Sequence, residues 1–237
     1  MNIALIGYGK MGKTIERIAL QRGHKITAIY ASKNPFLLED SARADVAIEF
    51  TAPDFVVNHI SKALSINLPI VVGTTGWNHR LDEVDSWVKA SGGSLLYASN
   101  FSLGVHVFEK LCAQLAGLLK GHDYLFRMDE THHVQKLDTP SGTAITLAEA
   151  ILAHHDGIQN WASNEGDGRT TLPIFSHRVP EVPGTHSVIA QSSIDSITLT
   201  HEANSRDGFA LGSIIAAEFL VGKSGLYTMN DVLNFKS

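Results

Sequence analysis

The densest run of polar side chains lies between residues 130 and 143 and reads ETHHVQKLDTPSGT. It holds two adjacent imidazoles, His132 and His133, and a lysine, Lys136, three residues further on. An imidazole and an ammonium group can each donate a proton to a reacting atom, and the ammonium group is also a fixed positive charge. The segment therefore predicts acid–base chemistry on an anionic ligand.

The end of the same segment predicts a binding site for a carboxylate. Ser141, Gly142 and Thr143 stand where a helix over residues 142–154 is expected to begin. The first backbone N–H groups of a helix have no partner within it, and they attract anions. Together with the cation and the imidazoles, they describe a pocket for a small dicarboxylate.

Two other interpretations of the histidine pair remain open. Paired histidines in loops are often solvated surface residues, and two imidazoles are also possible zinc ligands. Adjacent residues of an extended segment point in opposite directions, so His132 and His133 are not expected to share one ion. Lys136 would also repel a cation, and we therefore expect no metal.

A second motif, at the N-terminus, points to a nucleotide. The residues Gly7-Tyr8-Gly9-Lys10-Met11-Gly12 form G-x-G-x-x-G between an expected strand (2–6) and an expected helix (10–22). In this context the three glycines permit a tight turn, close approach of a pyrophosphate, and close packing of helix on strand. The motif predicts a dinucleotide-binding fold.

Three further loops, at 50–53, 73–77 and 98–101, follow expected strands of the same sheet and are expected to face the same nucleotide. Ligands of open α/β sheets bind at the carboxyl ends of the strands. The candidate cofactor contacts in these loops are Gly73, Thr74, Thr75, Ala98, Ser99, Asn100 and Phe101.

The choice between NADH and NADPH depends on the end of the second strand. An acidic residue there commonly binds the ribose hydroxyls, whereas this chain has Tyr30-Ala31-Ser32-Lys33. A hydroxyl and an ammonium group suit a 2′-phosphate, so Ser32 and Lys33 are candidate contacts of NADPH. The alternative is that Lys33 is a solvated loop residue, and the cofactor stays NADPH or NADH.

The elements that must position these residues form an α/β protein of two domains. Strands expected at 2–6, 25–30, 44–50, 69–73 and 94–98 alternate with helices, which predicts a Rossmann-type, doubly wound parallel sheet. Beyond residue 101 the pattern changes to α+β. Helices at 103–120 and 142–154 stand among strands at 123–130, 175–178, 185–190 and 193–202, which we expect to form a mostly antiparallel sheet.

The domain boundaries follow from this change of pattern. Residues 1–101 and 207–237 are expected to form the dinucleotide-binding domain, with the helix at 210–221 and the tail at 226–235 returning to it. Residues 102–206 are expected to form a domain for substrate binding and oligomerisation, with an exposed loop at 160–171.

The bulk properties exclude several classes of partner. A formal charge of -5 gives no basis for binding nucleic acid or an anionic membrane, and no apolar run reaches the roughly 20 residues of a membrane span. The single cysteine, Cys112, lies in an apolar helical stretch and is expected to be a core residue. These features favour a reducing, cytoplasmic compartment.

Seven segments, in order along most of the chain, resemble one family, 4-hydroxy-tetrahydrodipicolinate (dihydrodipicolinate) reductase of the diaminopimelate route to lysine. They are GYGKMG (7–12), EFTAP (49–53), GTTGW (73–77), ASNFSLGV (98–105), ETHHVQKLDTPSGTA (130–144), NSRDGFA (204–210) and GLYTMNDVL (225–233). The fifth is the most specific of these.

The resemblance implies roles for individual residues. His132 matches the acid–base histidine of the family and Lys136 its proton-donating lysine. His133, Lys136, Ser141, Gly142 and Thr143 match positions that bind the substrate carboxylates. The resemblance also implies a homotetramer. The alternatives are a related two-domain amino-acid or semialdehyde dehydrogenase and a non-catalytic nucleotide sensor. A sensor would need neither His132 nor Lys136.

Overall fold

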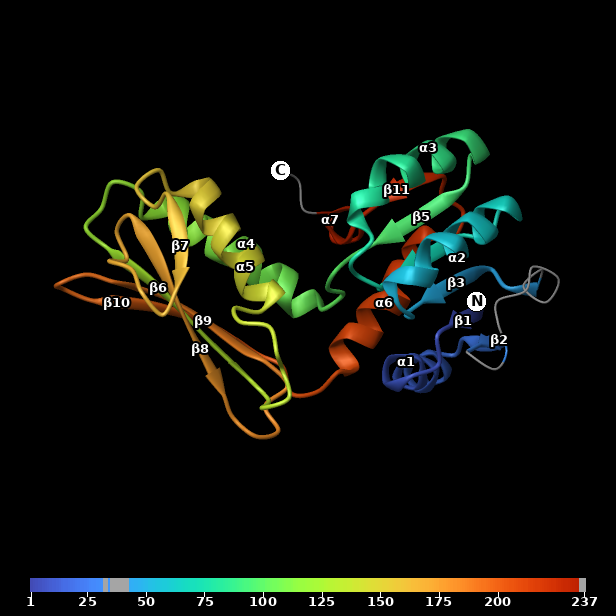
Figure 1. Ribbon diagram of the computed structural model, residues 1–237, viewed down its shortest axis with the longest axis horizontal. Coiled ribbons are helices and arrows are strands. Elements are labelled where there is room, and N and C mark those ends of the chain that lie inside the picture. The colour runs from blue at the N-terminus through green and yellow to red at the C-terminus, as the bar shows by residue number, and fades with distance from the viewer. Residues whose placement is uncertain (32–33, 35–42, 235–237) are drawn as a thin grey trace. The chain divides into compact units, whose positions relative to one another are not determined.

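The computed structural model describes residues 1–31, 34 and 43–234. Ser32 and Lys33, two of the expected cofactor contacts, lie outside the described residues. The chain divides into two compact units, Met1–Leu103 with Arg206–Ser237, and Gly104–Ser205. Figure 1 shows both units, and each is described by itself.

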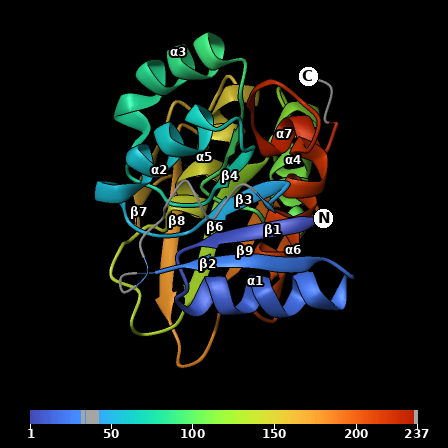
Figure 2. The same ribbon diagram turned by 90° about the vertical axis from the view of Figure 1, so that its right-hand side faces the viewer.

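The first unit contains a six-stranded sheet in the order β11-β5-β4-β3-β1-β2, in which every neighbouring pair is parallel. Figure 2 shows the sheet between its helices. The elements in chain order are β1 Asn2–Ile6, α1 Lys10–Gln21, β2 Lys25–Tyr30, β3 Val46–Glu49, α2 Pro53–Ser65, β4 Ile70–Val72, α3 Leu81–Ser91 and β5 Ser94–Tyr97, with a short 3-10 helix at Asn78–Arg80.

Alternate residues of these strands belong to two separate cores. Ala4 and Ile6 of β1 pack in the core that includes α2 and α3, whereas Ile3 and Leu5 pack in the core that includes α1 and α6 (Asp207–Leu220). Strands buried on both faces carry continuous apolar runs, which is the pattern that predicted a parallel sheet. The Rossmann-type fold expected from the sequence is confirmed.

The C-terminal segment completes this unit. Strand β11, Gly225–Tyr227, pairs with β5 as the sixth strand, and α7, Met229–Val232, packs beside α6. The return of the tail to the first unit is therefore confirmed. A strand of three residues carries too little periodicity to be recognised from sequence, and it was not predicted.

The second unit contains a five-stranded sheet in the order β10-β9-β6-β8-β7, with helices α4 and α5 packed on one face. The elements are α4 Leu103–Leu118, β6 Leu125–His132, α5 Gly142–His154, β7 Asn160–Ser163, β8 Thr171–Arg178, β9 Thr185–Gln191 and β10 Ser196–Glu202.

Two details of this unit differ from the prediction. The sheet is mixed rather than mostly antiparallel, because β6–β8 and β7–β8 pair in parallel while β6–β9 and β9–β10 are antiparallel. The chain passes from β6 through α5 to β7, and a crossover through a helix returns the next strand in the same direction. The segment 160–171, expected to be a loop, contains β7 and the first residue of β8.

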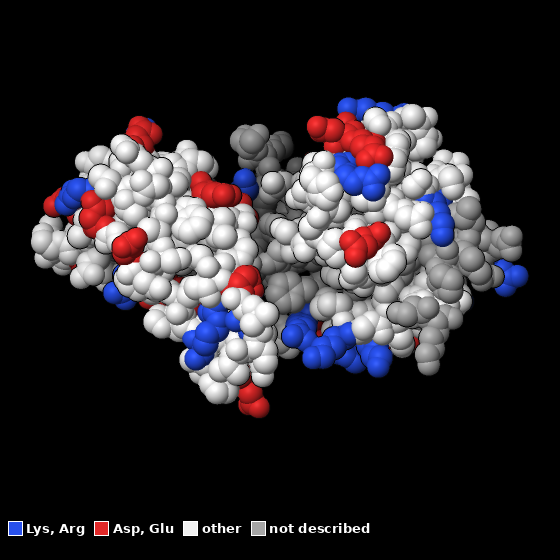
Figure 3. Space-filling view, viewed as in Figure 1, with Lys and Arg blue, Asp and Glu red and all other residues white. Residues whose placement is uncertain are grey.

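Cys112 is a core residue, as expected. Its side chain is fully buried in α4, and burial, followed by the nearby Glu109 carboxylate, raises the pKa of the thiol to about 12. No helix among the described residues has the length and apolar character needed to cross a membrane. On the face seen in Figure 3, acidic and basic side chains occur in small groups of both signs on each unit.

Candidate functional site

The glycine turn has the geometry that its sequence predicts. Gly7 adopts φ +98°, and a Cβ added there would lie 1.9 Å from the carbonyl oxygen of Phe50. A Cβ on Gly12 would lie 2.2 Å from the carbonyl oxygen of Gly7. These two positions therefore require glycine. A Cβ on Gly9 would meet nothing within 4 Å, so the start of α1 is open to an approaching group.

The N-terminus of α1 fits a pyrophosphate. Gly9 is the N-cap residue, no side chain caps the helix, and no acidic residue stands in its first turn. The backbone N–H groups and the helix dipole there attract anions. A cavity of about 660 Å³ adjoins the turn and is lined by Ile6, Gly7, Tyr8, Gly9, Tyr30, Ala31, Phe50, Thr51, Ala52, Phe55 and His59.

The remaining loop residues divide into exposed and structural ones. Thr74 is buried, and its hydroxyl accepts a hydrogen bond from the Thr51 amide at 2.7 Å, so it holds two loops together. Phe101 is buried against Phe50 in the core. Thr75 and Ser99 are exposed at the carboxyl ends of β4 and β5, where a nucleotide is expected.

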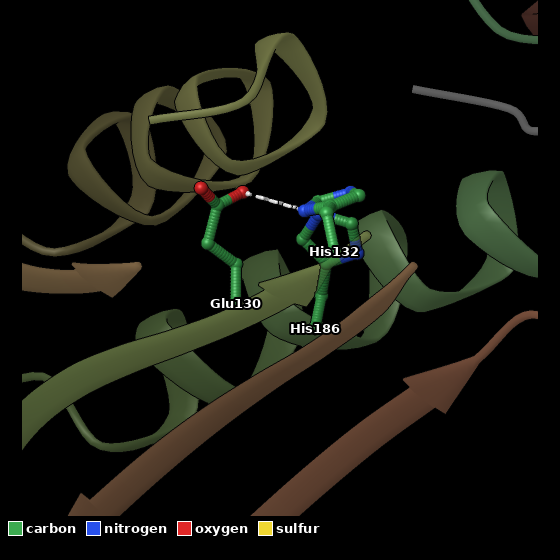
Figure 4. Close-up of side chains that lie close together, drawn as sticks. All are labelled: Glu130, His132 and His186. Atoms are coloured by element: carbon green, nitrogen blue, oxygen red, sulfur yellow. Dashed lines mark ion pairs between the residues drawn. The ribbon is translucent and has the colours of Figure 1, made fainter. Parts of the chain in front are cut away.

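In the second unit, strand register brings three side chains together on the buried face of the sheet. Glu130 of β6 stands opposite Ser176 of β8 and opposite His186 of β9. His132 lies two residues beyond Glu130 and therefore points to the same face. Figure 4 shows the Glu130 carboxylate directed toward Nδ1 of His132, with the His186 ring beside it.

The Glu130 carboxylate is fully buried and is held by hydrogen bonds. The amide of Ser141 donates to both of its oxygens at 3.1 Å, and the Ser176 hydroxyl donates to Oε1 at 2.7 Å. Oε2 lies 3.5 Å from Nδ1 of His132 and 3.7 Å from Nε2 of His186. Burial alone would raise the pKa of Glu130, but the hydrogen bonds from Ser141 and Ser176 outweigh it and lower the pKa.

Burial also lowers the pKa of both imidazoles. For His132, the Glu130 charge partly offsets burial, while the Lys136 and Arg178 charges add to it. For His186, burial and the neighbouring His132 lower the pKa to about 4. His186 is therefore neutral at physiological pH, and its Nε2 lies 3.2 Å from the Ser141 hydroxyl.

Lys136 lies in the turn that follows β6. Its Nζ donates to Asp138 Oδ2 at 2.8 Å, and this hydrogen bond lowers the pKa of Asp138. Arg178 of β8 fixes the turn, because its guanidinium donates to the carbonyl oxygens of Lys136 at 3.3 Å and Asp138 at 2.7 Å. His133 is half-buried, and its Nδ1 has no hydrogen-bond partner among the described residues.

The start of α5 separates the roles of the three residues expected to bind a carboxylate. Ser141 is the N-cap: its hydroxyl accepts from the Ala144 amide at 3.1 Å, and its own amide is bound to Glu130. Ser141 is thus committed to holding the helix on β6. Gly142 and Thr143 are the first two residues of α5, where backbone N–H groups favour an anion.

Glu130, His132 and His186 also form a group that could hold a metal ion, since one ligand atom from each lies within 4.8 Å of the others. The carboxylate already accepts two donors, and the Arg178 guanidinium lies 3.7 Å from Oε1. A divalent ion bound there would lie close to that positive charge, which disfavours the site. That the protein holds no metal stays a prediction.

The structure adds residues that sequence reasoning did not assign. Glu130 lay within the polar segment without a role, and His186, Ser176 and Arg178 carried no local signal. They reach the site only because three strands pair in a particular register. The one hint in the sequence was that Glu130 stands two residues before His132, a spacing that places both side chains on one face of a strand.

Comparisons with known proteins point to one family. The family model described as dihydrodipicolinate reductase, N-terminus, matches residues 1–101, and that described as dihydrodipicolinate reductase, C-terminus, matches residues 104–233. A 4-hydroxy-tetrahydrodipicolinate reductase of Christiangramia forsetii is 45% identical, with 99% of this chain and 98% of that protein covered. One of Staphylococcus carnosus is 34% identical, with 99% and 100% covered.

Solved structures show the same fold. A dipicolinate-bound dihydrodipicolinate reductase from Paenisporosarcina sp. TG-14 superimposes with a TM-score of 0.79 at 23% identity, covering 96% of this chain and 97% of that one. An amine dehydrogenase from Mycobacterium smegmatis gives 0.64 at 10% identity, covering 95% and 94%. By its family models and its relatives, this chain belongs to the dihydrodipicolinate reductase family.

Proposed function

We propose that this protein is an NAD(P)H-dependent reductase that converts 4-hydroxy-tetrahydrodipicolinate to tetrahydrodipicolinate, in the diaminopimelate route to lysine. The observation that carries the proposal is the grouping of His132, Lys136 and the start of α5 at one end of β6. Two proton donors there lie beside a site for carboxylates, in a chain whose relatives of this name match it over nearly the whole length.

A reduced nicotinamide nucleotide supplies the hydride. We assign its pyrophosphate to the turn at Gly7–Gly12 and its nicotinamide end to the loops that contain Thr75 and Ser99. The glycine turn, the uncapped start of α1 and the adjoining cavity support this assignment. Residues 1–101 and 207–237 would then form the nucleotide-binding domain, and 102–206 the substrate domain.

The residues of the second unit bind the substrate and move the proton. The substrate loses water to give a conjugated imine, and hydride adds at C4. Lys136 or His132 then protonates C3. We assign the substrate carboxylates to the backbone of Gly142 and Thr143, with His133 and Lys136 as further donors. Positive charge held in place beside the ring stabilises the negative charge that develops during hydride addition.

A coupled assay tests the activity. Purified protein, supplied with dihydrodipicolinate synthase, pyruvate and aspartate semialdehyde, is expected to oxidise NADPH or NADH, measured by loss of nicotinamide absorbance. Omission of the synthase is the control, since no substrate then forms. No oxidation with either nucleotide would reject the proposal. Oxidation of the nucleotide with aspartate semialdehyde alone would instead indicate reduction of the aldehyde to an alcohol, by a dehydrogenase that acts on a semialdehyde.

We further propose that NADPH is accepted at least as well as NADH. The support is the sequence after β2, where Ser32 and Lys33 stand without an acidic residue. The ratio of kcat/KM for the two nucleotides is the measurement. A strong preference for NADH would overturn this assignment of Ser32 and Lys33 and leave the reaction itself unaffected.

We also propose that the protein is a cytoplasmic homotetramer.

A further inference from the structure

We propose that Glu130 is a positioning residue: its carboxylate accepts a hydrogen bond from Nδ1 of His132 and so directs Nε2 of that imidazole to the substrate. That Nε2 of His132 faces the substrate rests on the proposed function. The hydrogen bond between Nδ1 and Glu130 concerns the protein alone and can be tested without activity. The contacts that Glu130 makes in the folded chain are what distinguish it from a structural residue.

Glu130 is held as a fixed negative charge. Its carboxylate is fully buried, yet it accepts the Ser141 amide and the Ser176 hydroxyl, from the start of α5 and from β8. Hydrogen bonds to the ionised form are what keep a buried carboxylate charged. Since these donors come from two other elements, the carboxylate cannot turn away from the face of β6 that carries His132.

His132 has the matching unsatisfied atom. Its side chain is 9% exposed, and its Nδ1 has no hydrogen-bond partner among the described residues. The nearest acceptor is Glu130 Oε2, at 3.5 Å. A buried N–H without an acceptor is costly, and hydrogen bonds of acid–base residues are often long in the unliganded protein and shorten when substrate binds. A movement of about 0.6 Å would complete this bond at ordinary length.

The other neighbours leave His132 little freedom to rotate. The His186 ring stands edge-on to it at 5.1 Å, and a Cβ added to Gly184 would lie 3.1 Å from Nε2 and 3.2 Å from Cδ2. The Nε2 edge of the His132 ring therefore lies close to Gly184, where a side chain would crowd it. Because Nδ1 faces Glu130, Nε2 is the nitrogen left for a ligand.

His186 does not compete for the same role. Its Nε2 makes both nearby polar contacts, with the Ser141 hydroxyl at 3.2 Å and with Glu130 at 3.7 Å. A serine–histidine–carboxylate relay needs the two ring nitrogens to contact different partners, so this trio is not one. His186 instead supports the N-cap of α5 in its neutral form.

Glu130 is also the main group that keeps His132 able to hold a proton. Besides Glu130, the charged groups around His132 are Lys136 and Asp138 in the turn after β6 and Arg178 on β8. His186 on β9 is titratable but neutral. Burial and the two cations favour neutral imidazole, and Glu130 opposes them more strongly than Asp138 does. Removing this carboxylate charge should therefore lower the pKa of His132.

The first test needs no substitution in the site. Nitrogen-15 NMR of the full wild-type chain reports which ring nitrogen carries hydrogen, and a His132→Asn variant assigns the signal. We expect neutral His132 to carry its hydrogen on Nδ1. The tautomer with hydrogen on Nε2 would overturn the proposal. An inactive protein with the expected tautomer would reject the proposed function and leave the hydrogen bond standing.

The second test is Glu130→Gln, which keeps the shape and removes the charge. We expect the pKa of His132, measured by NMR, to fall by about one unit or more. The alkaline limit of the kcat profile should move down by the same amount, with kcat reduced about 10- to 100-fold and nucleotide affinity unchanged. Glu130→Asp, which keeps the charge further from His132, should fall between the two.

A matched control separates positioning from structural support. Glu109→Gln removes the carboxylate of another glutamate–histidine pair, 3.8 Å from His106 on α4, and should leave kcat, the pH profile and the His132 pKa unchanged. If kcat of Glu130→Gln falls equally at every pH while the pKa of His132 stays constant, Glu130 only supports the structure and the proposal is wrong. Should Glu130→Gln fail to fold, Glu130→Asp and the wild-type tautomer decide.

Discussion

At the scale of single residues, hydrogen bonds fix the position of Lys136, whose charge acts on the His132 imidazole. Its ammonium group is bound to Asp138, and Arg178 pins the intervening backbone to β8. Side chains of paired lysine and aspartate at a protein surface contribute little to stability, so this pair matters for placement of the charge. Loss of the ammonium group should therefore affect turnover more than folding.

Lys136→Ala is expected to lower kcat by about 100-fold or more, because it removes a proton donor and a cation from the proposed site. Nucleotide affinity, measured by fluorescence titration, should change by less than about twofold, since Lys136 lies in the other unit. Lys136→Arg restores the charge without a readily lost proton. Recovery of turnover in that variant would assign proton delivery to His132, and unchanged turnover in Lys136→Ala would reject the role of Lys136.

His186 predicts a dependence of stability on pH. Its pKa is about 4 in the folded chain against 6.5 ordinarily, because burial disfavours the charged ring. The unfolded chain therefore takes up a proton between pH 6.5 and 4 that the folded chain resists. This stability is fully present above pH 6.5 and is lost as the pH falls, by up to about 3 kcal/mol.

The measurement is denaturant unfolding of wild type and His186→Gln at pH 7 and pH 4. Glutamine can replace the hydrogen bond to Ser141 without titrating. The variant should lose less stability on acidification than wild type does. Equal losses in the two proteins would show that His186 is not the group responsible.

At the scale of elements, two glycines of the turn have different roles: Gly12 allows close packing, and Gly9 leaves room for a ligand. Gly12→Ala would place a Cβ 2.2 Å from the Gly7 carbonyl oxygen, so α1 must shift. We expect a loss of about 2 kcal/mol or more in unfolding free energy. Gly9→Ala meets no atom within 4 Å and should keep wild-type stability, while nucleotide affinity falls about 10-fold where the pyrophosphate approaches.

Thermal unfolding and nucleotide titration of the two variants check this pair of expectations. Unchanged nucleotide affinity in Gly9→Ala would place the pyrophosphate elsewhere. Wild-type stability in Gly12→Ala would mean that the start of α1 can shift without a loss of unfolding free energy, contrary to this prediction.

The end of β6 shows why an element boundary can decide the chemistry. We predicted a strand over 123–130, whereas β6 is Leu125–His132. The two added residues place His132 in the strand, on the same face as Glu130, instead of in a loop. Polar residues at the end of a strand resemble a loop in sequence, and pairing with β8 and β9 extends the strand across them.

At the scale of the whole molecule, we expect the proposed tetramer to form through the second sheet. The core of this unit joins α4 and α5 to Phe126, Met128 and Val188 on one face. The alternate residue Ile189 of β9 points to the opposite face and is half-buried. A sheet face that its own helices leave uncovered is a common surface for association.

Light scattering on a sizing column should give the mass of four chains. Ile189→Glu is expected to shift this mass to dimers or monomers, because it places a charge in the proposed interface. Leu118→Glu, at a residue that is 77% exposed at the end of α4, adds the same charge elsewhere and should leave the tetramer intact. A monomeric wild-type protein would reject the assembly.

The sequence by itself determined the parts whose cause is local. A strand, a turn that needs glycine and a helix follow one another within the first 21 residues, so the nucleotide turn was recognisable without any distant contact. The alternation of buried strands and helices predicted the first sheet, and the segment from His132 to Thr143 identified the family.

Only the tertiary structure decided how that segment is supported. Ser176, which is 46 residues from Glu130 in the chain, donates a hydrogen bond to it, and Ser141 contacts His186, which is 45 residues away. Both contacts form because β6 pairs with β8 and β9 in one register. Side chains alternate between the faces of a strand, so a shift of one residue would have sent Glu130 to the other face. A single sequence carries no signal for that choice, and it left the partners of His132 open.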